Sequence, residues 1–225
     1  MGNGKIKGGR VYQTSLQYYG YNAATGWAGG TLHANANYSG YPSGTVDQSG
    51  RSIAVCSQSP QQGQHWLRVW RSGAGAWNDL GPATGVGIAA MTSRAVALGD
   101  TLLVAYVFTG GGGPELQVVR YDEAAQAWGA PATVAQGAGA FDAVASGRTL
   151  WIAWVQSGQV YLAFSPDEGA TFTPVPGPSG QSLNAQAGCD ASAVELFAPD
   201  DGTLLVAFDE RCGTGPYSVV LQKMQ

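Results

Sequence analysis

The chain has 225 residues, of which 34 are glycine, and 12% of its residues are charged, with a net charge of −4 at pH 7. A nucleic-acid partner needs a basic face for its phosphates, so this charge argues against nucleic-acid binding. No stretch shows the 3.6-residue apolar period of an amphipathic helix. The composition and this lack of helical periodicity predict an all-β protein.

The N-terminal residues carry no recognisable export signal or membrane anchor. Residues 1–10, MGNGKIKGGR, are positively charged, but no apolar run follows them, so they fit neither a signal peptide nor a transmembrane span. We expect a flexible segment over residues 1–9 in a single domain over residues 1–225. The expected protein is soluble, and the sequence leaves open whether it is extracellular, virion-associated, retained where it is made, or a mature form without its leader.

A hairpin motif recurs along the chain as a short apolar strand, a polar turn and a closing aromatic residue. Its copies span residues 15–27, 67–77, 116–128 and 160–172. The closing aromatics Trp27, Trp77, Trp128 and Phe172 stand 50, 51 and 44 residues apart by their positions. This spacing is typical of a β-propeller blade.

A second element recurs with the same period and consists of a Gly-containing turn followed by a strand that is apolar on both faces. Its copies span residues 50–58, 99–108, 147–156 and 202–211. Strands of this kind lie between two covering layers. Shorter segments at 93–98, 141–146 and 192–198 precede three of them and suit the innermost strand. Each unit therefore holds four antiparallel strands, which predicts a propeller of four-stranded blades.

The two ends of the chain have complementary strand deficits. The N-terminal part supplies a hairpin without inner strands, whereas the C-terminal part supplies inner strands and one further strand over residues 217–225. Propellers are commonly sealed by mixing such strands in one blade. We therefore expect about five blades and a ring closed by N- and C-terminal strands together.

Three cysteines have two different interpretations. Cys56 occupies a small apolar position of a buried strand, so we expect it to be inert packing. Cys189 and Cys212 flank the inner strands of the last unit, where the ends of an antiparallel pair meet, so a disulfide between them is geometrically plausible. Two thiols in adjacent loops of a cytoplasmic protein are the alternative. With two histidines and no paired cysteine ligands, we expect neither a metal nor a cofactor.

Residues 165–172, SPDEGATF, match the pattern S-x-D-x-G-x-T-[FW]. At this point the chain resembles the Asp-box (BNR) propeller families, which include sialidases. The residues expected to be structural are Ser165, Asp167, Gly169 and Phe172. The carboxylate can accept hydrogen bonds from turn N–H groups, glycine permits positive φ, and the aromatic ring fills the space between strands. The resemblance implies a folding device on the face opposite the active site, so the motif by itself supports no catalytic role.

The resemblance also implies that connections between blades and loops between the second and third strands of a blade share the functional face. Two such loops, residues 34–41 and 57–65, are rich in amides and aromatic rings, which suit sugar hydroxyls and pyranose faces. The candidate ligand-binding residues there are Asn35, Asn37, Tyr38, Gln58, Gln62 and His65. The charged run Asp209, Glu210 and Arg211 is a further candidate, for which an internal ion pair is the alternative.

Catalysis finds little support in the sequence. A sialidase-like site needs three clustered arginines, and only Arg94 and Arg211 could approach the channel mouth. A glycosidase with two carboxylates remains an alternative. It would combine Asp209 or Glu210 with Asp142, Asp190 or Glu195.

We therefore expect a non-catalytic binding propeller of lectin-like type. A structural or adaptor subunit of a larger assembly, of phage tail or injection-particle type, is the second interpretation, and a sialidase-like glycoside hydrolase is the third. The expected partner is a glycan or a protein, and the oligomeric state is left open.

Overall fold

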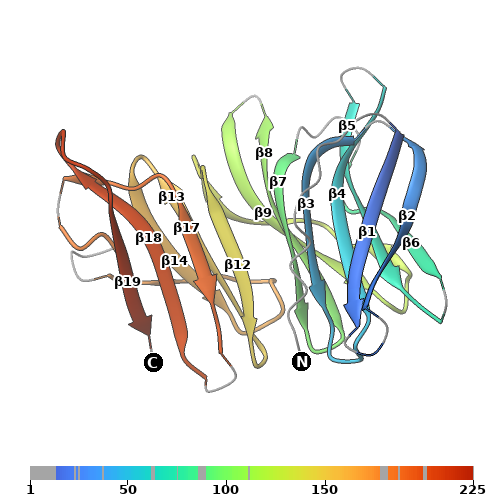
Figure 1. Cartoon of the computed structure of the whole chain (residues 1–225). Helices are drawn as coiled ribbons and strands as arrows, with labels where there is room; N and C mark the ends of the chain where they lie inside the picture. The colour runs from blue at the N-terminus through green and yellow to red at the C-terminus, as the bar shows by residue number, and fades with distance from the viewer. Residues whose placement is uncertain are drawn as a thin grey trace.

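A computed structural model describes residues 14–22, 24, 26–36, 38–61, 64–74, 76–85, 90–110, 112–177, 182–186, 188–199 and 202–224. The segment over residues 1–9 that was expected to be flexible lies outside this described part. The described residues form strands and connecting turns, and none of them is helical. Consecutive sheets follow one another around an arc from the N-terminal hairpin to the C-terminal sheet (Figure 1).

The strands of the described part are grouped in five sheets. The first is a hairpin of β1 (Thr14–Asn22) and β2 (Gly26–Ala36). The second contains β3 (Tyr38–Val46), β4 (Ser52–Gln61), β5 (Gln64–Ser72) and β6 (Trp77–Pro82). The third contains β7 (Ala90–Leu98), β8 (Thr101–Gly110) and β9 (Gly113–Asp122), and both β10 (Ala127–Trp128) and β11 (Ala132–Gln136) pair with β9.

The fourth sheet contains β12 (Phe141–Ser146), β13 (Thr149–Gln156), β14 (Gln159–Ser165) and β15 (Thr173–Val175). The fifth contains β17 (Val194–Phe197), β18 (Leu204–Cys212) and β19 (Ser218–Met224), with β16 (Cys189–Asp190) paired to the end of β18. All these pairs are antiparallel. The prediction of an all-β chain with antiparallel four-stranded sheets is confirmed.

Glycine turns join the innermost strand to the buried strand in the third and fourth sheets. The register pairs Leu98 with Thr101 and Ser146 with Thr149, which leaves two residues for each turn. Gly99 has φ 62° and occupies the first position of its turn, a conformation that costs glycine little. We call the end of the sheets that carries these turns the lower end, and the end with the β4–β5, β8–β9 and β13–β14 turns the upper end, as in Figure 1.

The apolar core lies between neighbouring sheets. On β8, Leu102 and Val104 pack with residues of the second sheet, whereas Leu103 and Ala105 pack with residues of the fourth. Successive side chains of a strand point to opposite faces, so a strand between two sheets must be apolar at every position. This explains why the buried strands have unbroken apolar runs in the sequence.

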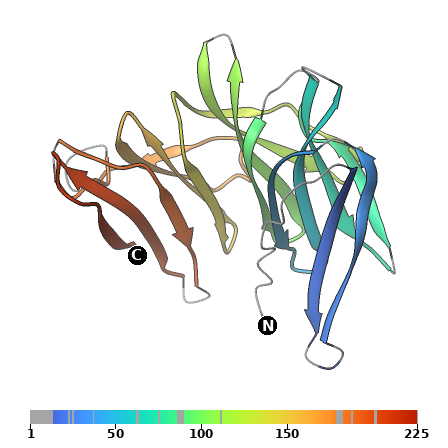
Figure 2. The same cartoon turned by 45° about the horizontal axis from the view of Figure 1, so that its top comes forward.

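The two ends of the chain do not share a sheet in the described part. β1 pairs with β2, and β19 pairs with β18 in the register Asp209 to Val219. The first hairpin and the fifth sheet lie at opposite ends of the arc in both views (Figure 2). The expected mixing of N- and C-terminal strands in one blade is not confirmed, because the described strands form no closed ring. No helix in the described part has the length and apolar character needed to cross a membrane.

Candidate functional site

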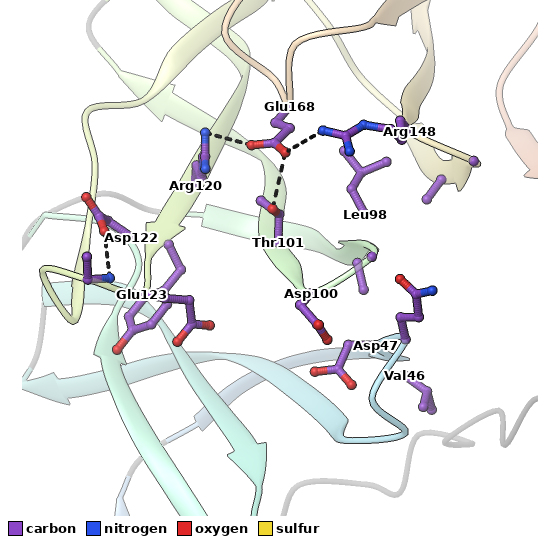
Figure 3. Close-up of a pocket in the computed structure, with 17 residues that line it drawn as sticks. Val46, Asp47, Leu98, Asp100, Thr101, Arg120, Asp122, Glu123, Arg148 and Glu168 are labelled. Atoms are coloured by element: carbon purple, nitrogen blue, oxygen red, sulfur yellow. Dashed lines mark hydrogen bonds and ion pairs between the residues drawn. The ribbon is translucent and has the colours of Figure 1, made fainter.

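A cavity of about 840 Å³ opens at the lower end of the sheets (Figure 3). Its walls come from the β3–β4, β7–β8 and β12–β13 turns, the β9–β10 turn, and the loop between β14 and β15. The cavity therefore spans three sheets on the face that carries the Asp-box motif. This is the face opposite the one that the sequence favours for function.

Ion pairs and turn hydrogen bonds occupy most charged groups around this cavity. Glu168 lies between Arg120, at 2.7 Å, and Arg148, at 3.8 Å, and it also accepts a hydrogen bond from the Thr101 hydroxyl (Figure 3). Asp122 accepts hydrogen bonds from the N–H groups of residues 124 and 125, at 2.8 and 3.0 Å. These contacts stabilise the turns of the lower end, so the charged lining has a structural role.

The loop over residues 165–172 is closed by its own side chains. Asp167 accepts hydrogen bonds from the Thr171 hydroxyl at 2.6 Å, the Thr171 N–H at 2.9 Å and the Ser165 hydroxyl at 2.7 Å, and these hold its pKa at about 2. Ser165 Oγ in turn accepts from Gly169 N–H at 2.8 Å. Gly169 has φ 84°, and a Cβ there would approach a methyl of Val118 to 3.0 Å. Phe172 packs against the core between the third and fourth sheets.

Three charged residues occupy the same position on successive innermost strands. Arg94 on β7, Asp142 on β12 and Glu195 on β17 are paired with alanines at matching positions of the next strand. Arg94 Nε donates to Asp142 at 2.6 Å, and its terminal nitrogen lies 4.0 Å from Glu195. The other Asp142 oxygen accepts the N–H of Leu196 at 2.8 Å. Asp142 therefore links three sheets and has both oxygens occupied.

The charged residues at the end of β18 make contacts with other residues of the fold. Asp209 accepts from the hydroxyl and N–H of Ser192 and from the N–H of Ala193. Burial alone would raise the pKa of Asp209, but these hydrogen bonds outweigh it and hold that pKa below its usual range. Glu210 is buried and accepts the Ala185 N–H at 3.0 Å. The Arg211 guanidinium lies 4.9 Å from the centre of the Tyr217 ring.

The structure describes one of the six candidate residues from the two amide-rich loops in full. Gln58 lies within β4 and is 4% exposed, so the expectation of an exposed loop residue is wrong for it. The side chains of Asn35, Asn37, Tyr38, Gln62 and His65 lie outside the described residues. The register pairs Tyr38 with Gln58 and Gln61 with Gln64. The backbone therefore places the start of β3 and the β4–β5 turn at the same end of the second sheet.

Cys189 and Cys212 form a disulfide with a Cα separation of 4.3 Å, and they face each other in the β16–β18 register. Glu210 lies beside them, but sulfurs joined in a disulfide are not thiolate ligands for a metal. Cys56 is buried, and burial raises the pKa of its thiol to about 12. It therefore stays protonated near neutral pH and is a poor nucleophile.

Hydrogen-bonded pairs of an amide and an aromatic side chain recur toward the upper end of three consecutive sheets. The pairs are Trp66 Nε1 to Gln58 Oε1 at 2.8 Å, Tyr106 Oη to Gln117 Oε1 at 2.8 Å, and Trp154 Nε1 to Gln156 Oε1 at 3.4 Å. Five of these six residues were missed from the sequence. The signal that could have found them is an aromatic residue at the end of a buried strand with a glutamine within two residues or on the paired strand.

The fourth sheet, which holds the Trp154 and Gln156 pair, offers the most accessible groups of this kind. The ring of Tyr161, which is half-buried, stacks on Trp154 with centroids 5.6 Å apart and an interplanar angle of 20°. Asp190 is exposed, and its carboxyl lies so close to Gly158 that a Cβ there would meet it at 2.4 Å. Gly158 has φ 76°, a backbone conformation that favours glycine. The absence of a Cβ also leaves room for the Asp190 carboxyl.

No family model matches the sequence, and no curated protein sequence matches it at a significant level. The fold is similar to that of a Dyadobacter fermentans protein of unknown function (12% identity, TM-score 0.56, 82% of this chain and 65% of that one). It is also similar to an endo-arabinase from Bacteroides thetaiotaomicron (13% identity, TM-score 0.51, 95% and 87%). A third similar structure is Trypanosoma rangeli sialidase with the inhibitor DANA (15% identity, TM-score 0.50, 95% and 41%).

The chain spans less than two thirds of the length of the Dyadobacter protein and of the sialidase. At these identities the likeness concerns the fold alone. The endo-arabinase and the sialidase have propeller folds, and the all-β sheets of this chain are arranged like part of such a propeller.

Proposed function

We propose that this protein is a propeller that binds carbohydrate at its upper end without cleaving it. The observation that carries the proposal is the repetition of an amide paired with an aromatic ring in three consecutive sheets. In each pair one member is buried, and the half-buried member that a ligand can reach is Trp66, Gln117 or Gln156. Amides both donate and accept hydrogen bonds, and aromatic rings offer apolar faces, so together they match the hydroxyls and ring faces of sugars.

The fourth sheet is the proposed centre of this site. Tyr161 and Gln156 are half-buried there, so a ligand can reach them, and the exposed Asp190 lies beside the neighbouring turn. A carboxylate accepts two hydroxyl hydrogen bonds at once, which favours a polyhydroxylated ligand. The candidate loop residues Tyr38 and Gln62 would extend the same end of the molecule at the second sheet.

The fold neighbours support the ligand class. Two proteins with similar folds are named as an endo-arabinase and a sialidase, and both names denote action on glycans. We also propose that the chain is a divergent Asp-box propeller. This rests on the hydrogen bonds of Asp167 and Ser165, which give the loop the closure expected of that motif.

Binding without cleavage is favoured because the candidate carboxylates already accept hydrogen bonds within the fold. A glycosidase of the common type needs an acid and a base or nucleophile that both reach the scissile bond. Asp142, Asp209 and Glu210 accept hydrogen bonds from N–H groups of the fold, and Asp142 is also paired with Arg94. Each would have to break these bonds before it could act on a substrate.

A glycan array followed by calorimetry with the best ligand tests the proposal. Tyr161→Ala should weaken binding about tenfold, since loss of a stacking ring costs about 0.5–1.5 kcal/mol and the neighbouring hydrogen bonds are disturbed with it. Arg148→Ala, at the lower end, should leave the affinity unchanged. An array without any specific signal contradicts binding, and turnover of a chromogenic arabinofuranoside or sialoside contradicts the non-catalytic role.

A further inference from the structure

The disulfide between Cys189 and Cys212 lies beside a buried carboxylate. The sulfurs of these cysteines and a carboxylate oxygen of Glu210 all lie within 4.8 Å of one another. Glu210 and Cys212 are two residues apart on β18, so their side chains share one face of the sheet. Cys189 lies opposite Cys212 on β16, although the two are 23 residues apart in the sequence. The fold therefore brings together three side chains of the kinds that bind metal ions.

Glu210 has no cationic partner in the described part of the chain. It is 6% exposed, and among the described residues its carboxylate accepts one hydrogen bond, from the Ala185 N–H at 3.0 Å. No arginine or lysine of the described residues forms an ion pair with it. A buried carboxylate normally has its charge compensated by a cation or by several hydrogen bonds. A metal ion bound beside Glu210 would supply that compensation.

Hydrogen bonds hold the segment that carries Cys189 in addition to the disulfide. The Cys189 carbonyl accepts hydrogen bonds from Gln159 Nε2 at 2.9 Å and from Asn184 Nδ2 at 3.1 Å. Asn184 is 0% exposed, and its Oδ1 accepts the Val160 N–H at 2.8 Å. These bonds fasten the segment to β14 of the fourth sheet. We therefore expect reduction of the disulfide to leave Cys189 close to the other two side chains.

A reduced pair of cysteines together with a carboxylate matches the ligand preferences of Zn²⁺. Tetrahedral zinc holds thiolate sulfur at about 2.3 Å and carboxylate oxygen at about 2.0–2.2 Å, so its ligand atoms lie roughly 3.5–3.8 Å apart. The three groups already lie within 4.8 Å of one another, so side-chain rotations after reduction can bring them to these separations. Three protein ligands leave the fourth position for water. The Gln186 amide lies beside this position, with Oε1 3.9 Å from Cys189 Sγ and 3.7 Å from Cys212 Sγ.

We propose that Cys189, Cys212 and Glu210 form a Zn²⁺ site in the reduced chain, and that the metal and the disulfide exclude each other. A thiolate of a dithiol reductant attacks at the exposed Cys212; the S–S bond breaks, two thiols form, and the reductant leaves as its own disulfide. Zn²⁺ then replaces the two thiol protons, which are released to solvent. The proposal does not depend on the proposed function, because none of the three ligands belongs to the proposed centre of sugar binding.

Titration of the reduced full chain with Co²⁺ and then with Zn²⁺ tests the proposal. Co²⁺ bound to thiolates shows sulfur-to-metal charge-transfer absorption, and Zn²⁺ should remove this signal by displacing the Co²⁺. The oxidised chain should show no such absorption. Cys56→Ala is the matched cysteine control and should leave metal binding unchanged, because Cys56 is buried in the second sheet and alanine holds its position in the next two, at Ala105 and Ala153.

Substitution of the carboxylate tests the third ligand. Glu210→Gln keeps an acceptor for the Ala185 N–H but removes the charge. It should lower the Zn²⁺ affinity of the reduced chain by more than about tenfold, an effect that is already usual for residues outside the ligand shell. Glu195→Gln changes an exposed carboxylate on β17 of the same sheet and should leave the affinity unchanged. Circular dichroism of each reduced variant checks that the fold is retained.

A second readout does not use cobalt. Bound Zn²⁺ should slow the alkylation of Cys212 in the reduced chain, followed by mass spectrometry, and should raise the melting temperature of that chain. A reduced chain that binds Zn²⁺ no more tightly than the oxidised chain overturns the proposal. An affinity that is unchanged by Glu210→Gln overturns it as well, and so does a reduced chain that unfolds and does not refold with Zn²⁺.

Discussion

Two strands with the same apolar pattern have different environments in the fourth and fifth sheets. β13 and β18 both follow a glycine turn and carry apolar residues on both faces. In β13 both faces are covered, and Ile152 and Ala153 are each 0% exposed. In β18 one face is covered, with Val206 0% exposed, whereas Ala207 on the other face is half-buried. An apolar run on both faces of a strand therefore does not by itself show that both faces are buried. Burial also requires a neighbouring sheet on each side.

A matched pair of substitutions tests this comparison with the largest expected effect. Ala153→Glu places an uncompensated charge between two sheets and should lower the free energy of unfolding by at least about 3 kcal/mol. Ala207→Glu, at the equivalent position of β18, should cost less than about 1 kcal/mol in the monomer, because solvent reaches that face. Urea denaturation at low protein concentration measures both. Equal losses would mean that this face of β18 is covered within one chain.

A substitution in the turn after β14 should change the free energy of unfolding by an intermediate amount. Ser165 is 0% exposed and accepts the N–H of Gly169. Ser165→Ala leaves that N–H unpaired and should cost about 1–3 kcal/mol. Ser218→Ala, on the exposed start of β19, is the control and should change stability by no more than about 0.5 kcal/mol. A neutral Ser165→Ala would show that the loop closes without this hydrogen bond.

The titration of Asp167 gives a smaller and more local effect. Its pKa is depressed to about 2 from 3.8, chiefly by the Thr171 hydroxyl. The ionised carboxylate therefore stabilises the fold fully above about pH 4, and this contribution is lost as the pH falls through about 2. Thr171→Val should raise the Asp167 pKa toward 3.8, measured by carboxyl NMR titration. An unchanged pKa in that variant would refute the assigned cause.

The smallest effect is expected at the lower cavity. The side chain of Arg148 is 93% exposed and 3.8 Å from Glu168. Exposed pairs at this distance contribute little, so Arg148→Ala should change the free energy of unfolding by no more than about 0.5 kcal/mol. A larger loss in thermal unfolding would assign this pair a greater role in holding together two turns of the fourth sheet.

Much of the fold could be predicted because its signals are local. The strand over residues 147–156 and its glycine turn can be recognised from alternation and turn chemistry, and β13 lies there. Strand partners far apart in the sequence could not be predicted in this way. Residues 217–225 were assigned to a blade shared by both ends of the chain, and the described strands show only the pairing of β19 with its neighbour β18.

The site could be predicted less well than the fold. Gln58 was selected for its residue type, but the sequence does not show where β4 ends, and a shift of one residue in register decides which face of the sheet an amide lies on. The Tyr106 and Gln117 pair joins two strands, so it becomes visible only once their register is known. Residue type alone therefore indicated amide-rich segments at the upper end but not the residues that pair with aromatic rings there.

The measurement that tests the central claim most directly is backbone NMR with the glycan that gives the strongest signal on the array. The account predicts chemical-shift changes at Gln156, Tyr161 and Gln117, toward the upper end of the third and fourth sheets. Changes confined to Arg120, Arg148 and Glu168 at the lower cavity would contradict it, and so would a spectrum that no glycan perturbs.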